Sequence, residues 1–526
     1  MSQLDVLIVG AGPTGLVLAL WLQKQGVNVR IIDKASGPAT NSRALVVHAR
    51  ILELYRQIDL ADELLSHGYK LPATNVWVDG HQRAHIPLRE FGIEMTPYPF
   101  ILSIPQDEHE RILERRLNSH GIFVERRTSL KNFVNGELGV VATLVNEDTG
   151  IESTCESAYI VGCDGAHSVV RHGIGAKYEG DTYVPLFYIA DLEAEEQESP
   201  FFNGEAHLTF VDDTFNLIVP YAQERRIRLI GTTIPRTNEP EADQSDHPEI
   251  TFEDVLPDIK KASKLEIKQV NWFSTYRSHH RIAEKFRSNR AFLVGDAAHI
   301  HSPVGGQGMN TGIMDAINLA WKLATVVKQP SIGEGARNQL LDSYESERRS
   351  FALSVVGATD HGFKTITTPG FLPHILRAWI IPYIVPLVTK IQSVRSEIFR
   401  RGSQLVCCYR GSPISRCIGN GGTVQSGDRL PWAKTEDSDN FSSLSGISWQ
   451  AHVYGDEQPA LTEWCKGKNV QLHVFEWDQR HAQIGLRKDA TYLLRPDHYI
   501  AGVFEGEEVE AQLEEYLSSH EFCINA

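Results

Sequence analysis

The chain has 526 residues and a formal net charge of −16, and its hydrophobic and charged fractions, 42% and 22%, are those of an ordinary globular protein. Composition therefore excludes a fibrous chain and a wholly disordered one, and the length predicts about three domains. The acidic balance disfavours nucleic acid as a partner, because like charges repel. The seven cysteines include no C-x-x-C spacing, which disfavours a disulfide framework or a zinc site and favours the reducing cytoplasm.

The first segment predicts a βαβ unit. Acidic Asp5 stands where a signal peptide would carry basic residues. Residues 5–9 and 29–33 are short apolar runs, which predict buried strands, and residues 15–25 have helical spacing between them. Strand, helix and strand within about thirty residues form a right-handed parallel unit.

A G-x-G-x-x-G turn joins the first strand to the helix. In such a turn Gly10 permits the tight bend, Gly12 lets the backbone approach a pyrophosphate, and Gly15 lets helix and strand pack closely. Free N–H groups and the helix dipole favour an anion there. Asp33 ends the second strand, where a carboxylate can accept a hydrogen bond from a ribose hydroxyl. A plain structural turn is the alternative.

The middle of the chain predicts a sheet inserted into an α/β domain. Residues 138–157 predict a hairpin with its turn at Asp148, and 159–162 another buried strand. An antiparallel sheet is expected between about residues 183 and 275, with strands at 187–192, 207–211, 215–220 and 226–232. The α/β pattern then returns with a strand at 291–294 and helices at 308–328 and 340–359.

The last part predicts a small separate α/β domain. The apolar run 378–389 is too short and too rich in proline to span a bilayer, so a buried or surface-packed helix is expected, with weak membrane-surface contact as the alternative. Polar, turn-rich stretches follow. Strands are expected at 470–475 and 499–503, and a helix at 507–518.

Three further motifs follow buried strands. In 294–299, Asp296 can accept a hydrogen bond from a ribityl or ribose hydroxyl. In 303–310, a glycine-rich turn opens a helix and presents N–H groups to a developing anion. Asn310 is alternatively only the cap of that helix. Asp164 also follows a strand, although Asp-Gly is often merely a turn. His299 and His301 are not spaced as a helical metal pair, and no metal site is predicted.

Together these segments resemble the flavin-dependent aromatic hydroxylases of the para-hydroxybenzoate hydroxylase and phenol hydroxylase type, over roughly residues 3–360. The run 492–500 resembles a signature of the thioredoxin-like domain, without redox cysteines, that often ends one branch of this family. The implied fold class is α/β: a Rossmann-like FAD-binding βαβ domain with an inserted antiparallel substrate sheet and a C-terminal thioredoxin-like domain. The expected parts are the first FAD-binding part (1–180), the substrate sheet (181–275), the second FAD-binding part with its helices (276–395) and the C-terminal domain (396–526).

The resemblance implies which residues bind the adenosine half of FAD. Gly10, Gly12 and Gly15, with Pro13 and Thr14 between them, would hold the pyrophosphate. Asp33, followed by Lys34, stands where the family has an acid on the adenosine ribose. Arg43 matches an arginine near the phosphates.

The flavin half would be bound by later segments. Gln106 matches a glutamine that touches the sugar chain, Asp296 would bind the ribityl chain, and Asp164 would serve both FAD and nicotinamide binding. The remaining positions lie at the ring: Pro303 by the reactive edge, and Gly308, Met309 and Asn310 by the pyrimidine.

Substrate residues are less clearly marked. Leu45 stands where phenol hydroxylase has an acid, and Ala222 where para-hydroxybenzoate hydroxylase has a carboxylate-binding arginine, which disfavours a simple benzoate. Four side chains are candidates to face the substrate, and one of them to deprotonate a phenol: His48, Tyr188, Tyr221 and Tyr276. For each, a packed structural role is the alternative.

The resemblance implies an FAD-dependent monooxygenase. NADPH or NADH would reduce the flavin, O2 would add to give a C4a-hydroperoxyflavin, and a phenolic or polyketide-like aromatic ring would be hydroxylated. Two alternatives stay open: Baeyer–Villiger insertion or epoxidation on the same fold, and a non-catalytic binding protein with an FAD-type fold. A homodimer and the preferred nicotinamide nucleotide are also left open.

Overall fold

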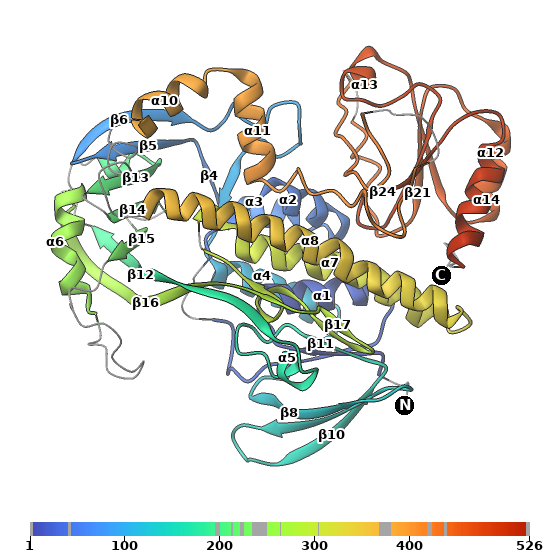
Figure 1. Cartoon of the computed structure of the whole chain (residues 1–526), viewed down its shortest axis with the longest axis horizontal. Coiled ribbons are helices and arrows are strands. Elements are labelled where there is room, and N and C mark those ends of the chain that lie inside the picture. Colours follow the sequence, from blue (N-terminus) through green and yellow to red (C-terminus); the bar gives the residue numbers. More distant parts are fainter. Residues whose placement is uncertain are drawn as a thin grey trace.

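The computed structural model describes residues 4–39, 44–194, 200–211, 214–220, 226–233, 250–263, 265–302, 304–367, 380–417, 423–435 and 439–521. Three predicted site residues, Arg43, Tyr221 and Pro303, lie outside these ranges. In Figure 1 the long helices α7 and α8 cross the middle of the molecule, between a large sheet on one side and the C-terminal domain on the other.

The glycine turn belongs to a five-stranded sheet with the order β17-β18-β11-β1-β2. β1 pairs in parallel with β2 and β11, and β11 pairs in parallel with β18. The strands are Val6–Val9 (β1), Val29–Ile32 (β2), Tyr159–Gly162 (β11), Arg287–Ser288 (β17) and Ala291–Leu293 (β18). Helix α1, Pro13–Lys24, joins β1 to β2 and is largely buried, as its many apolar residues require. The predicted βαβ unit is confirmed.

Shorter elements surround this sheet. Two three-stranded sheets have the orders β3-β7-β4 and β10-β9-β8, and the second contains the predicted hairpin. Their strands are Val46–Val47 (β3), Tyr69–Leu71 (β4), Ile101–Ser103 (β7), Thr128–Asn135 (β8), Val140–Asn146 (β9) and Glu152–Ser157 (β10). The helices are Ala49–Tyr55 (α2), Arg56–Ile58 (η1), Ala61–His67 (α3), Gln106–Ser119 (α4) and Val169–Gly173 (α5).

The inserted sheet has eight strands in the order β19-β16-β12-β15-β14-β13-β5-β6. Its strands are Ala73–Val78 (β5), His81–Pro87 (β6), Tyr178–Ala194 (β12), Ala206–Val211 (β13), Thr214–Pro220 (β14), Arg226–Thr233 (β15), Ile267–Ala283 (β16) and His299–Ile300 (β19). It is larger than the predicted interval 181–275, because β5 pairs in parallel with β13 and brings β6 with it. Helix α6, Phe252–Ser263, covers one face through Val255 and Ile259.

The second half of the α/β part is helical. Helix α7, Gln307–Lys328, packs on α1, and α8, Glu334–Thr367, packs on α7. Two 3-10 turns precede them, Gly295–Ala297 (η3) and Val304–Gly306 (η4). Then come α10, Ile381–Val388, and α11, Gln392–Gly402. Within the predicted apolar run, α10 lies at the surface against β6, with Ile384 half exposed and Leu387 63% exposed. Among the described residues no helix is long and apolar enough to cross a membrane.

The C-terminal part has its own five-stranded sheet, with the order β20-β24-β23-β21-β22. A parallel β21-α12-β22 unit is followed by α13, the antiparallel pair β23-β24 and α14. The elements are Arg416–Cys417 (β20), Gln450–Tyr454 (β21), Pro459–Gly467 (α12), Gln471–Phe475 (β22), Gln479–Gln483 (α13), Thr491–Leu494 (β23), Ile500–Phe504 (β24) and Val509–His520 (α14). The predicted strands and helix of this small α/β part are present, and its status as a separate, thioredoxin-like domain stays a prediction.

Thiol chemistry is not expected in this domain, because its candidate cysteines, Cys465 and Cys523, are not paired in sequence; Cys523 lies outside the described residues. Cys465 lies in the core on α12, and burial raises the pKa of its thiol to about 12, so a reactive thiolate does not form near neutral pH. We expect Cys465→Ser to leave the steady-state turnover number unchanged, measured as NAD(P)H consumption at saturating substrate. A large loss of turnover in a variant that still melts at the parental temperature would contradict this prediction.

Candidate active site

The glycine turn has one open face. Gly10 has φ +102°, and a Cβ there would stand 2.3 Å from the Cys163 carbonyl oxygen; a Cβ on Gly15 would stand 2.0 Å from the Gly10 oxygen. A Cβ on Gly12 would meet no protein atom within 4 Å. Gly12 is also the N-cap of α1, and no side chain caps that helix. The positive end of the helix dipole therefore points into open space, which suits a pyrophosphate.

Asp33 shapes the same turn. Its Oδ2 accepts the backbone N–H of Ala11 at 2.6 Å, and its Oδ1 accepts that of Ala35 at 2.7 Å. The Asp33 carboxylate thus lies directly beside the turn, where the sequence analysis placed the adenosine ribose. The neighbouring Lys34 is exposed at this rim.

Asp164 has one occupied and one unoccupied carboxylate oxygen. Oδ2 accepts the N–H groups of Val169 and Val170 at 2.7 and 3.2 Å, so part of its role is to fix the start of α5. Oδ1 is buried and has no hydrogen-bond partner among the described residues. Burial raises the pKa of this carboxyl. The turn interpretation therefore accounts for Oδ2 and leaves Oδ1 for a ligand.

Thr14 brings two distant segments against the glycine turn. A Cβ on Gly295 would stand 2.9 Å from Thr14 Oγ1, and one on Gly312 would stand 2.6 Å from the same atom. η3 and α7 can therefore approach α1 this closely only because both positions are glycine. Next to Gly295, the side chain of Asp296 is exposed, while its backbone oxygen accepts the Tyr178 hydroxyl at 3.0 Å.

Asn310 does not cap α7. The N-cap is Gly306, with φ +62°, and Asn310 lies one turn into the helix, fully buried. Its Nδ2 donates to the Val46 and Gly306 oxygens, both at 2.8 Å, and its Oδ1 accepts the His48 N–H at 2.9 Å. The cap interpretation is wrong, because the amide instead ties α7 to β3. Both N–H donors of the Asn310 amide are thus occupied by protein backbone.

The other two predicted ring positions begin the same helix. A Cβ on Gly308 would come within 3.8 Å of His301, and Met309 is partly buried against the main core. Gln106 begins α4, where its Oε1 accepts the Ala44 N–H at 3.1 Å. Gln106 thus holds the residue that follows Arg43.

One ring nitrogen of His48 contacts backbone, and the other, Nδ1, is buried without a partner among the described residues. Its Nε2 lies 3.1 Å from the Gly305 oxygen, and since a carbonyl only accepts, Nε2 carries the proton. Burial lowers the pKa of His48 to about 4, so the ring is neutral near pH 7 and poorly matched to deprotonating a phenol. The structural alternative therefore describes His48 better than the catalytic one.

Tyr188 points away from the flavin turn. It lies in the cluster beneath α6, and its hydroxyl donates to Asn216 Oδ1. Strand alternation puts Val219 on the opposite face from Ile218 of that cluster, and Val219 packs with Leu45, next to β3. The structural alternative therefore describes Tyr188 better, and its role as a substrate-facing residue stays an untested prediction.

Tyr276 lies on the sheet face opposite α6, stacked on Phe187 with ring centroids 5.5 Å apart. It therefore remains a candidate to face the substrate.

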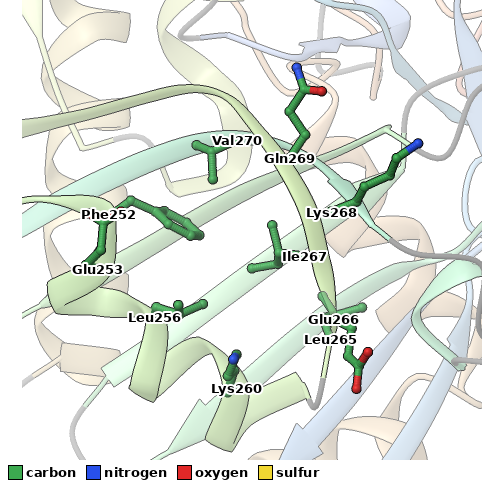
Figure 2. Close-up of a pocket in the computed structure, with 10 residues that line it drawn as sticks. All are labelled: Phe252, Glu253, Leu256, Lys260, Leu265, Glu266, Ile267, Lys268, Gln269 and Val270. Atoms are coloured by element: carbon green, nitrogen blue, oxygen red, sulfur yellow. The ribbon is translucent and has the colours of Figure 1, made fainter.

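A surface cavity of about 490 Å³ lies elsewhere, between α6 and the start of β16. Figure 2 shows Phe252 and Leu256 facing Ile267 across it, while Lys268 and Gln269 point away. Its lining consists of Phe252, Glu253, Leu256, Lys260, Leu265, Glu266, Ile267, Lys268, Gln269 and Val270. None of these is a predicted cofactor residue, so this cavity is separate from the flavin site.

A buried charge pair, which no sequence motif indicates, lies behind η3. Asp315 Oδ2 accepts the Gly295 N–H at 3.1 Å and contacts His299 Nε2 at 2.6 Å. Its Oδ1 accepts Arg348 Nε at 2.6 Å, and both side chains are fully buried. Burial alone would raise the pKa of Asp315, but Arg348 and His299 outweigh it and lower the pKa. No local motif marks this contact, since α8 supplies Arg348 from 33 residues further along the chain.

The residues present fit a bound FAD. The open face of Gly12 and the uncapped start of α1 suit the pyrophosphate, and Asp164 Oδ1 and His301 Nε2 are buried polar atoms without a protein partner among the described residues. Such atoms are costly unless a ligand or water meets them. In the described part of the chain, no group of His, Cys, Asp or Glu could hold a metal ion.

Comparisons with known proteins show the family of the chain. A family model described as an FAD binding domain matches residues 3–359. The 6-methylpretetramide 4-monooxygenase of Streptomyces rimosus is 33% identical over 94% of this chain and 90% of its own length. The pentachlorophenol 4-monooxygenase of Sphingobium chlorophenolicum is 32% identical over 67% of this chain and 63% of its own length.

Solved structures agree as well. The OxyS anhydrotetracycline hydroxylase of Streptomyces rimosus is 26% identical, with a TM-score of 0.76 and 99% of each chain covered. The family model spans more than half of the chain. The relatives named above are monooxygenases, and the first of them aligns with most of this chain. The chain therefore belongs to the FAD-binding aromatic monooxygenases and is an FAD-dependent monooxygenase.

Proposed function

We propose that the protein hydroxylates a phenolic or polyketide-like aromatic substrate, with FAD as cofactor and O2 and NADPH or NADH as co-substrates. The observation that carries the proposal is the junction of the glycine turn with η3 and α7 through Thr14, beside the open face of Gly12. The relatives' substrates, a pretetramide and a chlorophenol, support an aromatic ring.

The predicted cofactor residues are proposed to bind different parts of FAD. Gly10, Gly12 and Gly15 hold the pyrophosphate, and Asp33 the adenosine ribose. The roles of Lys34, Arg43 and Gln106 at the sugar and phosphates, and of Pro303, Gly308, Met309 and Asn310 at the ring, follow the family pattern. FAD bound there supplies the redox and oxygen-activating chemistry. The chain's own part is to place the aromatic ring and exclude water.

The substrate side is proposed to be the sheet face opposite α6. Phe187, Phe215 and Tyr276 form an apolar cluster on that face. Stacking and burial there would orient an aromatic ring. Tyr221 remains a proposed substrate contact.

The test is turnover on a panel of phenols and larger polycyclic phenols. Purified, yellow protein is mixed with NADH or NADPH, and nucleotide consumption is compared with the oxygenated product. Hydroxylation and Baeyer–Villiger insertion both add one oxygen, so product NMR has to locate it: on a ring carbon for hydroxylation, between two carbons for insertion. Nucleotide consumption without any oxygenated product across the panel would refute the proposal.

Asp296→Ala tests the proposed ribityl contact. A hydrogen bond to a charged acceptor is strong, so its loss should weaken FAD about ten- to a hundredfold. Because the substrate face is built by another sheet, saturating FAD should restore most of the rate without changing the preferred phenol. FAD affinity is measured by flavin fluorescence, with Asp148→Ala on an exposed hairpin turn as the control. Unchanged affinity would remove Asp296 from the site, and a rate that FAD cannot restore would make it catalytic.

We further propose that the protein acts in the cytoplasm, on the absence of paired cysteine spacings. We also propose that the parts 1–180, 181–275, 276–395 and 396–526 have the functions given above, with β5 and β6 of the first part and β19 of the third part added to the substrate sheet. A homodimer is proposed on the family resemblance and is tested by light scattering.

A further inference from the structure

The run 492–500, which marks the C-terminal domain in the sequence, has no role in the proposed reaction. In the structure its centre is a three-residue segment between β23 and β24, formed by Arg495, Pro496 and Asp497, which we name the clamp segment. Both charged side chains are buried. Both side chains contact helices of the FAD-binding part, α8 and α7.

Arg495 binds two carboxylates. Its Nη1 and Nη2 donate to both oxygens of Glu347 on α8, at 2.7 and 3.0 Å. Its Nε and Nη2 donate to Asp497, at 2.9 and 2.6 Å. Burial alone would lower the pKa of Arg495, but Asp497 and Glu347 outweigh it and raise the pKa well above its usual range. The guanidinium is thus charged and fully engaged.

Helix α7 completes this network. Asp497 Oδ2 accepts Trp321 Nε1 at 3.2 Å and Asn318 Nδ2 at 3.3 Å. Lys322 Nζ donates to Glu347 Oε2 at 2.7 Å. The two positive and two negative side chains balance one another without solvent, so the contact is specific for this docking geometry.

The clamp segment also binds α2 and η1 through its backbone. Arg50 Nη2 donates to the Asp497 oxygen at 2.8 Å, and Gln57 Nε2 donates to the Pro496 oxygen at 2.6 Å. Arg50 is the second residue of α2, which begins directly after His48. In Figure 1 the C-terminal domain lies beside α2 and the crossing of α7 and α8, as these bonds require.

Helices α2 and α7 are therefore tied together at two places. At the flavin turn, Asn310 of α7 bonds the backbone of Val46 and His48, just before α2. At the other place, the clamp segment bonds both helices. Along α7, Asn310 at the first place and Asn318 at the second are eight residues apart, about 12 Å. A rigid helix transmits a displacement over that distance, because its backbone hydrogen bonds keep its length and shape.

We infer that Arg495 and Asp497 are positioning residues for the flavin site: the clamp segment fixes the spacing of α2 and α7 and thereby the shape of the turn from Gly305 to Asn310. This inference rests on the proposed placement of the flavin ring at that turn. It assigns the C-terminal domain a part in cofactor geometry, in place of thiol chemistry.

The experiment compares two variants of the full chain. Asp497→Asn keeps the volume and one acceptor oxygen but removes the charge that faces Arg495. Leu461→Ala opens a cavity in the same domain, in the buried face of α12, and lies outside the clamp segment in sequence. FAD dissociation constants, the visible spectrum of the bound flavin and the melting temperature are measured without substrate.

We expect Asp497→Asn to raise the FAD dissociation constant about tenfold or more and to shift the flavin absorption band, because small displacements of a binding turn have large effects. Leu461→Ala should lower the melting temperature at least as much while leaving FAD affinity within about twofold. Arg495→Lys keeps the charge but loses the bidentate contact with Glu347, and we expect it to weaken FAD binding less than Asp497→Asn does. It provides the second measurement if Asp497→Asn fails to fold.

The inference is overturned if Asp497→Asn and Arg495→Lys bind FAD with the parental affinity and spectrum, or if Leu461→Ala weakens FAD equally. Since none of these measurements includes substrate, a failure to find a hydroxylated product refutes the proposed function and leaves this result standing.

Discussion

Gly12→Val is expected to abolish tight FAD binding in a protein that still folds. The valine side chain meets no protein atom near its Cβ, so the apoprotein should melt at nearly the parental temperature. The same side chain occupies the space of the pyrophosphate, and we expect a loss of affinity of about a hundredfold or more, roughly 2.7 kcal/mol. Flavin fluorescence titration and circular dichroism together check both halves of this expectation.

Gly15→Val is the matched comparison, because its Cβ would collide with the Gly10 oxygen at 2.0 Å. That variant should lose the fold along with the cofactor, as an overlap with backbone cannot be relieved by a rotamer change. The assignment of the turn is refuted if Gly12→Val retains parental FAD affinity. It is also refuted if both variants unfold to the same extent.

Asp315→Ala should have the largest effect on stability. It leaves Arg348 buried and unpaired and removes the acceptor of the Gly295 N–H, and breaking a buried pair in this way costs about 3–5 kcal/mol. FAD should also be released at lower denaturant concentration, because η3 carries Asp296. Urea unfolding followed by tryptophan fluorescence, with and without FAD, measures both effects.

The control for Asp315→Ala is Glu397→Ala, which breaks partly exposed pairs with Arg400 and Arg401 on α11. Such pairs contribute little, about 0–1 kcal/mol. If Asp315→Ala changed the urea midpoint no more than this surface variant does, the buried pair would have no anchoring role.

The parts of the fold that depend on neighbouring residues could be predicted from sequence. The glycine turn and the βαβ unit follow from the bond geometry that Gly10 and Gly15 require, within thirty residues. The strands β12 to β15 followed from their apolar runs. Strands β5 and β6 were missed for two reasons. The partner of β5, β13, lies about 130 residues later in the chain, and β6 is short, mostly exposed and rich in polar residues.

The site residues could be predicted where a sequence motif marks them. They could not be predicted where the role depends on the face of the sheet to which a side chain points. Strand alternation places Tyr188 and Phe187 on opposite faces, but which face α6 covers depends on packing between segments more than sixty residues apart. The buried pair of Asp315 and Arg348 has the same origin. In sequence each is an ordinary charged residue on an amphipathic helix, and only the docking of α8 on α7 makes them partners.

The five-stranded sheet also sets the order in which a newly made chain can fold. β1 obtains its neighbour β2 almost at once, but β11 emerges from the ribosome well over a hundred residues before its second neighbour β18. During that interval β11 has an open, apolar edge, which is a template for pairing with other chains. A nascent or truncated chain that ends before residue 293 should therefore depend on chaperones and collect in inclusion bodies, whereas one extended past β18 has its edge closed.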